Sequence, residues 1–391
     1  MAHQMVYLSQ RHTVSFALVC DPHISYETES ERASRATVPL AGFYRIDASR
    51  PGKGRMIMDE LLLTRPTFYA RDYCASTLQD TFKGKEFDVL WAAPVGMGSF
   101  CEAYKESRGP DHVPKIVVGI NEAMYYSYFE QGLAMIVGRE AISFAGTLRL
   151  FRSLLLRYHE KKYLMRFDAC HVQTENEARR TQKILPNCKP RVIVSQNGKH
   201  EELLDIPYTG AETKNVLLLA HMIHGRERQG VWFLRKVWPK VRDIHKDAVL
   251  HVVGLMAEGK LEQWILSRPG VIPKGFIPNL SDAYRNMTVS VVPVLQSTGV
   301  INRIVDAMSA GVPVVASPES ISTIDGFRPG IHGISAKGSR ETAIAISELL
   351  GDSKRLDGFS TVARQFVRRR FTWENSCHII EKSLEKLTSL C

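Results

Sequence analysis

Short apolar runs alternate along the chain with longer stretches in which apolar residues recur at helical spacing. In the first half, runs rich in β-branched residues predict strands at 13–20, 38–47, 87–92, 115–120, 169–173 and 191–195. Helical periodicity predicts helices at 141–166 and 176–184. This alternation favours a parallel sheet, and the loops that follow its strands (21–35, 94–99 and 121–128) should meet at one edge, where ligands bind.

A second series of the same kind fills the rest of the chain. It follows the stretch 203–214, which contains Pro207 and Gly210 and is predicted to be a linker. Strands are predicted at 215–220, 248–253, 271–274, 289–294, 312–316 and 333–335, and helices at 230–244, 280–285, 302–310, 340–350 and 353–369. The sequence therefore predicts an α/β chain of two doubly wound Rossmann-like domains, residues 1–205 and 206–370, with a last helix over 371–391.

The stretch 291–317 combines a strand, a small-residue loop, a short helix, a glycine turn and a second strand. Gly311 stands where the helix needs a left-handed residue to end. A small-residue loop (297–299) that leads from a strand into a helix is typical of phosphate binding, because the helix N-terminus attracts anions. Asp306 lies one turn into the helix, where its carboxylate could accept hydrogen bonds from a ribose.

This stretch resembles the donor-site signature of retaining GT-B glycosyltransferases of family 4, the glycosyl transferases group 1. The signature has an acidic residue, seven further residues, Glu-Ala-Met and then Gly-x-Pro-Val-Val; the chain has Asp306-Ala307-Met308 followed by Gly311-Val312-Pro313-Val314-Val315. Thr298 occupies the place of the first acid. A branch associated with exopolysaccharide synthesis also lacks that acid and has Gly-x-x-Asn-Lys, where this chain has Gly299-Val300-Ile301-Asn302-Arg303.

The resemblance implies a fold and a donor site. It implies that the two domains face each other across a cleft, with the C-terminal helix crossing back to the first domain. The second domain would hold a nucleotide sugar, with the base near Phe276 and Ile277 and the ribose at Asp306. The diphosphate would lie along the loop and helix start, which contain Thr298, Gly299, Val300, Ile301 and Asn302.

Sugar transfer leaves negative charge on a diphosphate, so cations aimed at that charge supply much of the catalysis. The basic loop after the first strand of the second domain offers Arg226 and Arg228, and the helix start offers Arg303. Asn121 ends a buried strand of the first domain, in a region where the family places contacts to donor or acceptor. We expect these four residues to act in catalysis. Other candidates in the same loops are His23, Glu122, His221 and His224.

Composition and charge narrow the classes of binding partner that we expect. The net charge of +10 favours anionic partners, but no zinc-finger spacing, aromatic RNA-binding signature or long Lys/Arg block predicts nucleic acid. The seven cysteines are scattered, without metal-ligand spacing, as in reduced cytosolic proteins. No apolar stretch approaches the roughly 20 residues of a membrane span, and we expect no signal peptide and a cytoplasmic location.

The basic stretch 139–166 also carries many apolar residues, so peripheral contact with an anionic membrane is one interpretation. Its charges at 149, 152, 157 and 161 cover a broad arc, which favours instead an ordinary helix packed on the sheet.

The predicted activity is retaining transfer of a sugar from a nucleoside-diphosphate sugar, with UDP or GDP as the expected nucleotide, to a glycan, a lipid-linked carrier or a protein. No cofactor or metal is expected, and the sequence has no Asp-x-Asp motif. Two alternatives stay open. A hydrolysing nucleotide-sugar epimerase of the same fold would need first-domain acids and histidines in the cleft. A non-catalytic binding or regulatory subunit is suggested by Thr298 and by the missing loop lysine.

Overall fold

The computed structural model describes residues 2–20, 40–47, 81–82, 84–107, 113–121, 123–137, 144–185, 191–199, 201–223, 227–256, 259–293 and 301–389. The chain divides into two compact units. The first comprises residues 1–196 and 373–391, and the second comprises 197–372. The sequence placed the division at 205/206 and the start of the last helix at 371.

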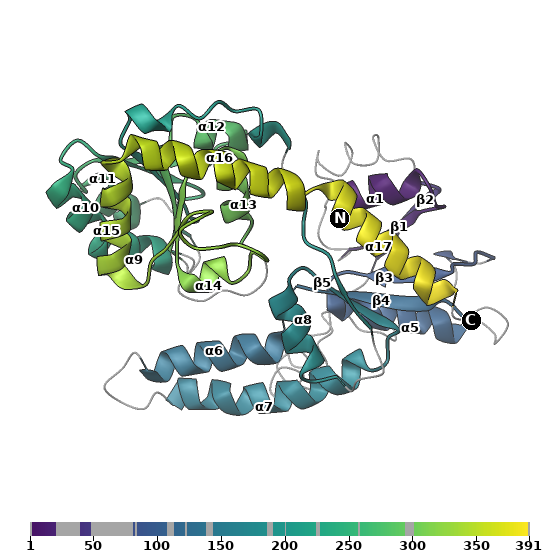
Figure 1. Cartoon of the computed structure of the whole chain (residues 1–391). Coiled ribbons are helices and arrows are strands. Elements are labelled where there is room, and N and C mark those ends of the chain that lie inside the picture. Colours follow the sequence, from purple (N-terminus) through teal and green to yellow (C-terminus); the bar gives the residue numbers. More distant parts are fainter. Residues whose placement is uncertain are drawn as a thin grey trace. The chain divides into compact units, whose positions relative to one another are not determined.

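The first unit is built on a parallel sheet in the order β3-β4-β5-β6, which are Val89–Ala92, Lys115–Ile120, Ala169–Val172 and Arg191–Val194. A separate parallel pair joins β1 (Ser15–Cys20) to β2 (Gly42–Asp47). The helices are α1 (Ala2–Ser9), α5 (Gly98–Ser107), α6 (Met124–Val137), α7 (Phe144–Leu164), α8 (Glu175–Gln182) and α17 (Trp373–Thr388), and a 3-10 turn, η1, covers Val95–Met97. Figure 1 shows α6 and α7 side by side as a helical hairpin.

Helix α17 belongs to the first unit although it ends the chain. It packs against α1 and β6, and Leu384 and Leu387 join a small core with Val117, Ala169 and Ile193 of the sheet. The hydroxyl groups of Ser195 and Ser376 lie 2.6 Å apart, so a buried hydrogen bond fastens the start of α17 to the residue that follows β6.

The second unit contains a six-stranded parallel sheet in the order β12-β11-β10-β7-β8-β9. Its strands are β7 (Asn215–Leu219), β8 (Val249–Val253), β9 (Val271–Gly275), β10 (Val289–Val292), β11 (Val314–Ala316) and β12 (Ile334–Ser335). Its helices are α9 (Arg228–Lys236), α10 (Trp238–Ile244), α11 (Lys260–Leu266), α12 (Leu280–Tyr284), α13 (Asn302–Ser309), α14 (Pro318–Ile321), α15 (Gly338–Leu350) and α16 (Ser353–Arg370), with 3-10 turns η2 (Glu201–Leu203) and η3 (Gly210–Glu212). The first and fourth strands of this unit, β7 and β10, are neighbours at the centre of the sheet, which is the doubly wound arrangement.

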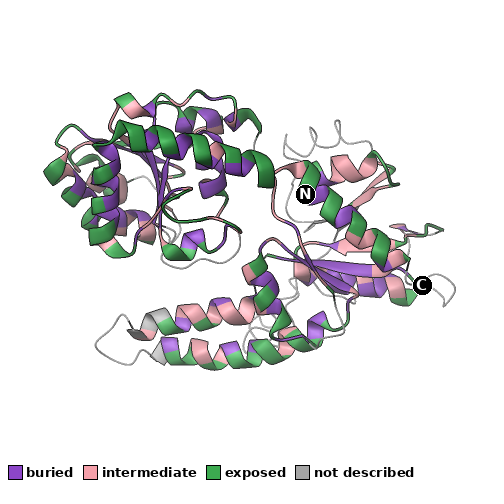
Figure 2. Cartoon of the chain, viewed as in Figure 1, coloured by how far each residue is buried: buried purple, intermediate pink, exposed green. Residues whose placement is uncertain are grey.

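The central strands of this sheet are buried on both faces. Two apolar clusters lie on its opposite faces, one that includes α13 and α16 and one that includes α9, α10 and α15. The burial colours in Figure 2 follow the same division, with buried strands inside and helices exposed on one side only. No described helix has both the length and the apolar character that crossing a membrane requires.

Three local features of the second unit bear on the predictions. Gly311 has a φ of 71°, which confirms the left-handed end predicted for α13. The predicted helix 230–244 is two helices, α9 and α10, because Pro239 has no N–H to continue the first. The stretch 203–214 is not a free linker: Leu203 and Ile206 are buried in the core of this unit, and Tyr208 donates a hydrogen bond to the Thr288 carbonyl at 3.1 Å.

Candidate functional site

The candidate site lies where the winding of the second sheet reverses. After β7 the chain passes to α9, and after the neighbouring strand β10 it passes to α13, so the two connections leave adjacent strands in opposite directions. In open α/β sheets this switch point is where ligands bind. The loop that leads into α13 contains the predicted phosphate contacts Thr298, Gly299 and Val300, which lie outside the described residues.

Arg303 is the side chain that joins the two sides of this switch point. It is the second residue of α13, and its Nη1 donates a hydrogen bond to the carbonyl of Leu219, the last residue of β7. The guanidinium is therefore held at the carboxyl end of the central strand, and its predicted role in phosphate binding stays a prediction. Burial lowers the pKa of Arg303. A cation that has lost much of its hydration gains strongly from an anion placed beside it.

Asp306 lies one turn further along α13 and is only 8% exposed. It faces Tyr284 of α12, whose hydroxyl donates a hydrogen bond to the Arg303 carbonyl at 3.4 Å. Burial and, after it, the negative charge of Asp306 raise the pKa of Tyr284 well above its usual range. The predicted ribose ligand is thus close to Arg303 in the chain and is held on the inner side of its helix.

The backbone N–H of Ile301, which was predicted to bind phosphate, instead binds a side chain of the protein. The backbone N–H of Ile301 donates a hydrogen bond to Oγ1 of Thr323 at 3.2 Å, and the Thr323 hydroxyl donates to the Ser320 carbonyl at 2.7 Å. The side chain of Ile301 packs against the core. In this arrangement the Ile301 amide is not free for a diphosphate, which differs from the sequence prediction. Asn302, the next residue, is exposed at the start of α13.

The segment after β7 is held against the end of β8. Backbone N–H groups of Ala220 and Met222 donate to the carbonyls of Val253 and Leu255, at 2.9 and 2.7 Å. His221 is exposed, and its Nδ1 accepts a hydrogen bond from the N–H of Leu255 at 3.2 Å, which gives this histidine a role in fixing the loop. Gly254 has a φ of 140°, and a Cβ there would overlap the Ala220 carbonyl.

The predicted cations of this loop are only partly placed. Arg228 is exposed as the first residue of α9, whereas Arg226 and His224 lie outside the described residues. Glu227 was not predicted as a site residue, yet its Oε2 is buried and has no hydrogen-bond partner in the described part of the chain. Its position between Arg226 and Arg228 in the basic loop is the sequence feature that could have identified it as a candidate.

The segment predicted to lie near the base follows β9. Gly275, with a φ of 66°, ends the strand, and the next residue, Phe276, is 64% exposed. Ile277 instead packs against the core cluster that includes α13. An exposed ring at the carboxyl edge of the sheet can stack on a planar base.

Comparison with known proteins finds a family model that matches most of the second unit. Residues 213–352, less than half of the chain, match the family model of glycosyl transferases group 1. The second unit is a group 1 glycosyltransferase domain, and the chain is a glycosyltransferase of the GT-B fold. The matched segment includes β7, the loop after it and α13, which are the parts that carry the candidate site. No curated protein matches this glycosyltransferase significantly.

Solved structures resemble the whole chain. HepE (Alr3699) of Anabaena, in complex with UDP and glucose, has a TM-score of 0.65 at 14% identity, with 98% of this chain and 94% of that chain covered. Sucrose-phosphate synthase of Thermosynechococcus elongatus has a TM-score of 0.68 at 14% identity, covering 100% and 92%. TarM of S. aureus has a TM-score of 0.59 at 15% identity, covering 82% and 58%. At these identities the likeness shows the fold.

In the first unit, the predicted residue Asn121 follows β4 and is exposed at the carboxyl edge of that sheet. The next residue, Glu122, and the other first-unit candidate, His23, lie outside the described residues. At the start of the next helix, α6, carboxylates of the protein itself accept the free backbone N–H groups. Glu177 accepts the N–H of Ala123 at 3.0 Å, and Glu160 accepts the N–H groups of residues 124 and 125 at 3.1 and 3.2 Å.

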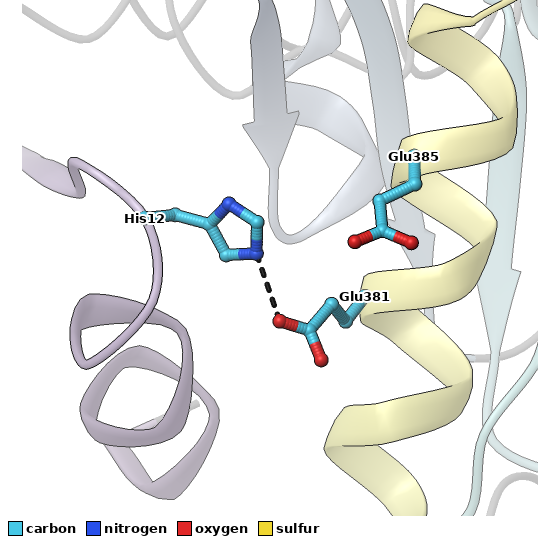
Figure 3. Close-up of side chains that lie close together, drawn as sticks. All are labelled: His12, Glu381 and Glu385. Atoms are coloured by element: carbon cyan, nitrogen blue, oxygen red, sulfur yellow. Dashed lines mark hydrogen bonds and ion pairs between the residues drawn. The ribbon is translucent and has the colours of Figure 1, made fainter.

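One group of described residues has ligand atoms close enough for a metal ion, and it also lies in the first unit (Figure 3). The ligand atoms of His12, Glu381 and Glu385 lie within 4.8 Å of one another. Glu381 is already engaged: its Oε1 lies 2.9 Å from Nε2 of His12, and its Oε2 accepts a hydrogen bond from Tyr7 at 3.4 Å. The cluster therefore ties the N-terminal segment to α17, and an ion would have to displace these contacts.

Proposed function

We propose that this glycosyltransferase moves a sugar from a nucleoside-diphosphate sugar to an acceptor, with retention of the anomeric configuration and without a required metal or other cofactor. The observation that carries the proposal is the placement of Arg303, whose guanidinium is held at the end of β7 beside the start of α13. A cation and a helix N-terminus at a switch point are together suited to a diphosphate.

In this proposal the donor lies along the carboxyl edge of the second sheet. Arg303 and the start of α13 bind the diphosphate, Asp306 accepts hydrogen bonds from the ribose, and Phe276 stacks on the base. UDP is the nucleotide we favour, because similar structures such as HepE contain it. Reaching Asp306 requires a local rearrangement, since its carboxylate is on the inner side of α13.

The chemistry follows from the leaving group. As the bond between sugar and diphosphate breaks, negative charge grows on the phosphate, and Arg303, with Arg226 and Arg228 of the basic loop, stabilises it. In the retaining mechanism that we propose, the departing phosphate takes the proton of the acceptor hydroxyl on the same face of the sugar. No protein carboxylate is then needed as a base. This agrees with Thr298 in place of the first acidic residue of the family signature.

We further propose that the acceptor is a glycan, a lipid-linked carrier or a protein, presented by the first unit with Asn121 among its contacts. Transfer would take place in the cytoplasm, with peripheral contact to the membrane surface.

The test is thermal stabilisation by UDP, GDP, ADP and dTDP, each with and without EDTA, followed by turnover of the matching sugar donor. Because a ligand that binds only the native state raises the melting temperature, one nucleotide should stabilise the chain, unchanged by EDTA. The matching donor should then be consumed only with acceptor, and NMR should show a product with the donor's anomeric configuration. Release of nucleotide without acceptor would favour the epimerase, and binding without turnover would favour the non-catalytic subunit.

A further inference from the structure

The outer face of α7 carries an apolar stripe that the core does not use, and Lys162 lies within it. The inward face is marked by the buried positions 146, 153, 156 and 163. Each of these has a large apolar residue two positions later, at 148, 155, 158 and 165. Two residues correspond to about 200° of rotation on a helix, so this second set lies opposite the buried one.

The side chains of this outer stripe are large and open to solvent. Between 36% and 66% of each is exposed, and the set comprises Leu148, Phe151, Leu154, Leu155, Tyr158 and Met165. Scattered apolar residues are normal on a protein surface, but six large exposed apolar side chains on one face of a helix favour an interaction site.

The charges beside the stripe are of one sign. Helix α7 contains five Lys or Arg residues and a single acidic residue, Glu160. The Glu160 carboxylate points away from the stripe, because it accepts the backbone N–H groups at the start of α6. Arg152, Lys161 and Lys162 have no ion-pair partner in the described part of the chain. The surface that accompanies the stripe is therefore basic and uncompensated.

The hairpin presents this surface on a helix that is already formed. Glu160 connects α7 to the first turn of α6, Arg149 donates a hydrogen bond to Oε1 of Gln131, and Glu177 of α8 binds the N–H of Ala123. Because the described residues of this surface are already helical, binding does not have to fold them, which reduces the entropy cost of association.

We infer that the outer face of α7 docks the protein on an anionic lipid bilayer, with its apolar side chains among the acyl-chain ends and Arg152, Lys161 and Lys162 at the headgroups. This arrangement is that of an interfacial helix, in which long basic side chains reach out of an apolar face. The heptad-like spacing would also suit a second copy of the chain. Two such faces would, however, bring like charges together, which disfavours that occupant. The inference deepens the membrane contact named in the proposed function by assigning it to α7, and it does not depend on sugar transfer.

The experiment is flotation of the full-length protein with vesicles of phosphatidylcholine alone and of phosphatidylcholine with 30% phosphatidylglycerol. Binding should require the anionic lipid. Since each Lys or Arg near an anionic surface contributes about fivefold in affinity, the triple reversal Arg152→Glu, Lys161→Glu and Lys162→Glu should reduce binding at least about 100-fold. The double variant Phe151→Ser and Leu154→Ser should reduce it at least about tenfold.

Matched variants in the second unit supply the controls. The reversal Lys236→Glu, Lys260→Glu and Lys354→Glu makes the same change in net charge at three exposed positions. Ile244→Ser with Leu266→Ser removes two apolar side chains that are 65% and 57% exposed. Both should bind vesicles within about twofold of wild type, and melting temperatures should show that every variant is folded.

Three results would overturn the inference. The first is equal binding of the α7 variants and their controls, and the second is equal binding to neutral and anionic vesicles. The third is a dimer, seen by analytical ultracentrifugation, that the Phe151→Ser, Leu154→Ser variant dissolves; that result would assign the stripe to a second copy.

Discussion

Helices α6 and α13 begin in equivalent places but in opposite electrostatic surroundings. Each follows the carboxyl end of an inner strand of a parallel sheet, β4 in the first unit and β10 in the second. At α6 the first backbone N–H groups bind the carboxylates of Glu160 and Glu177. At α13 the neighbouring charge is the guanidinium of Arg303. The same fold position thus has the protein's own carboxylates bound to it in the first unit and a cation beside it in the second.

The comparison shows that topology offers an anion site and side chains decide whether it is used. A carboxylate supplied by the protein satisfies the partial positive charge at a helix start and excludes an external anion. A cation at the same place increases the attraction instead. Substitutions at the two helix starts should therefore have different effects.

Removing the cation at α13 should have the greatest effect. We expect Arg303→Ala to lower kcat for sugar transfer by about 100- to 1000-fold, because one fixed donor to the leaving phosphate is lost. The kcat of Arg303→Lys should fall between those of wild type and Arg303→Ala, since lysine keeps the charge but lacks the planar guanidinium that binds phosphate through two N–H groups. Steady-state kinetics measures both. Unchanged turnover in a folded Arg303→Ala protein would remove Arg303 from the mechanism.

Removing the carboxylates at α6 should affect stability and leave nucleotide binding alone. Glu177 is buried and accepts the N–H of Ala123 while it pairs with Arg180. Glu177→Gln should therefore lower the free energy of unfolding by about 1–3 kcal/mol. Urea unfolding followed by circular dichroism measures this. Glu385→Gln, an exposed carboxylate of the same unit, should stay within about 0.5 kcal/mol of wild type.

Weakening the nucleotide contact should separate binding from turnover. We expect Asp306→Ala to reduce nucleotide affinity by about tenfold or more, as for the loss of hydrogen bonds to a charged group. Isothermal titration calorimetry measures the affinity. Asp282→Ala, which removes an exposed carboxylate of the same unit, serves as the control. Wild-type affinity in the Asp306 variant would show that this carboxylate only helps to organise α13 and Tyr284.

A buried histidine should make the first unit sensitive to acid. Burial lowers the pKa of His171 to about 4. The unfolded chain, with an ordinary histidine pKa near 6.5, binds the proton more tightly, so this contribution to stability is complete above about pH 6.5 and is lost as the pH falls towards 4. The slope should be about 1.4 kcal/mol per pH unit. Urea unfolding at several pH values should show this slope in wild type, and a similar slope in His171→Asn would contradict its origin.

The sequence predicted the strands better than the contacts between distant segments. The strand 115–120 has its predicted bounds, and the end of α13 at Gly311 follows from a local rule for left-handed residues. Helices α5 and α6 were missed because their starts follow strands closely and were assigned to loops. The role of Glu160 could not be predicted, because its partners lie more than 30 residues away in the chain.

For the candidate site too, the sequence predicted the element on which residues lie but not their contacts with distant segments. The local motif placed Arg303 and Asp306 on one short helix, and the structure has them there. What the sequence could not supply is which groups the protein satisfies internally. The Ile301 amide is bound by Thr323, a residue 22 positions later, and His221 supports the loop through Leu255. Such pairings depend on tertiary packing, which has no signal in local spacing.

The most direct test of the central claim is calorimetric titration of UDP into the wild-type protein, Arg303→Ala and the control Lys236→Ala. If the switch point between β7 and β10 holds the diphosphate, wild type and control bind UDP equally and Arg303→Ala binds it at least about tenfold more weakly. Equal affinity of all three proteins, with all three folded, would contradict the placement of the diphosphate at Arg303.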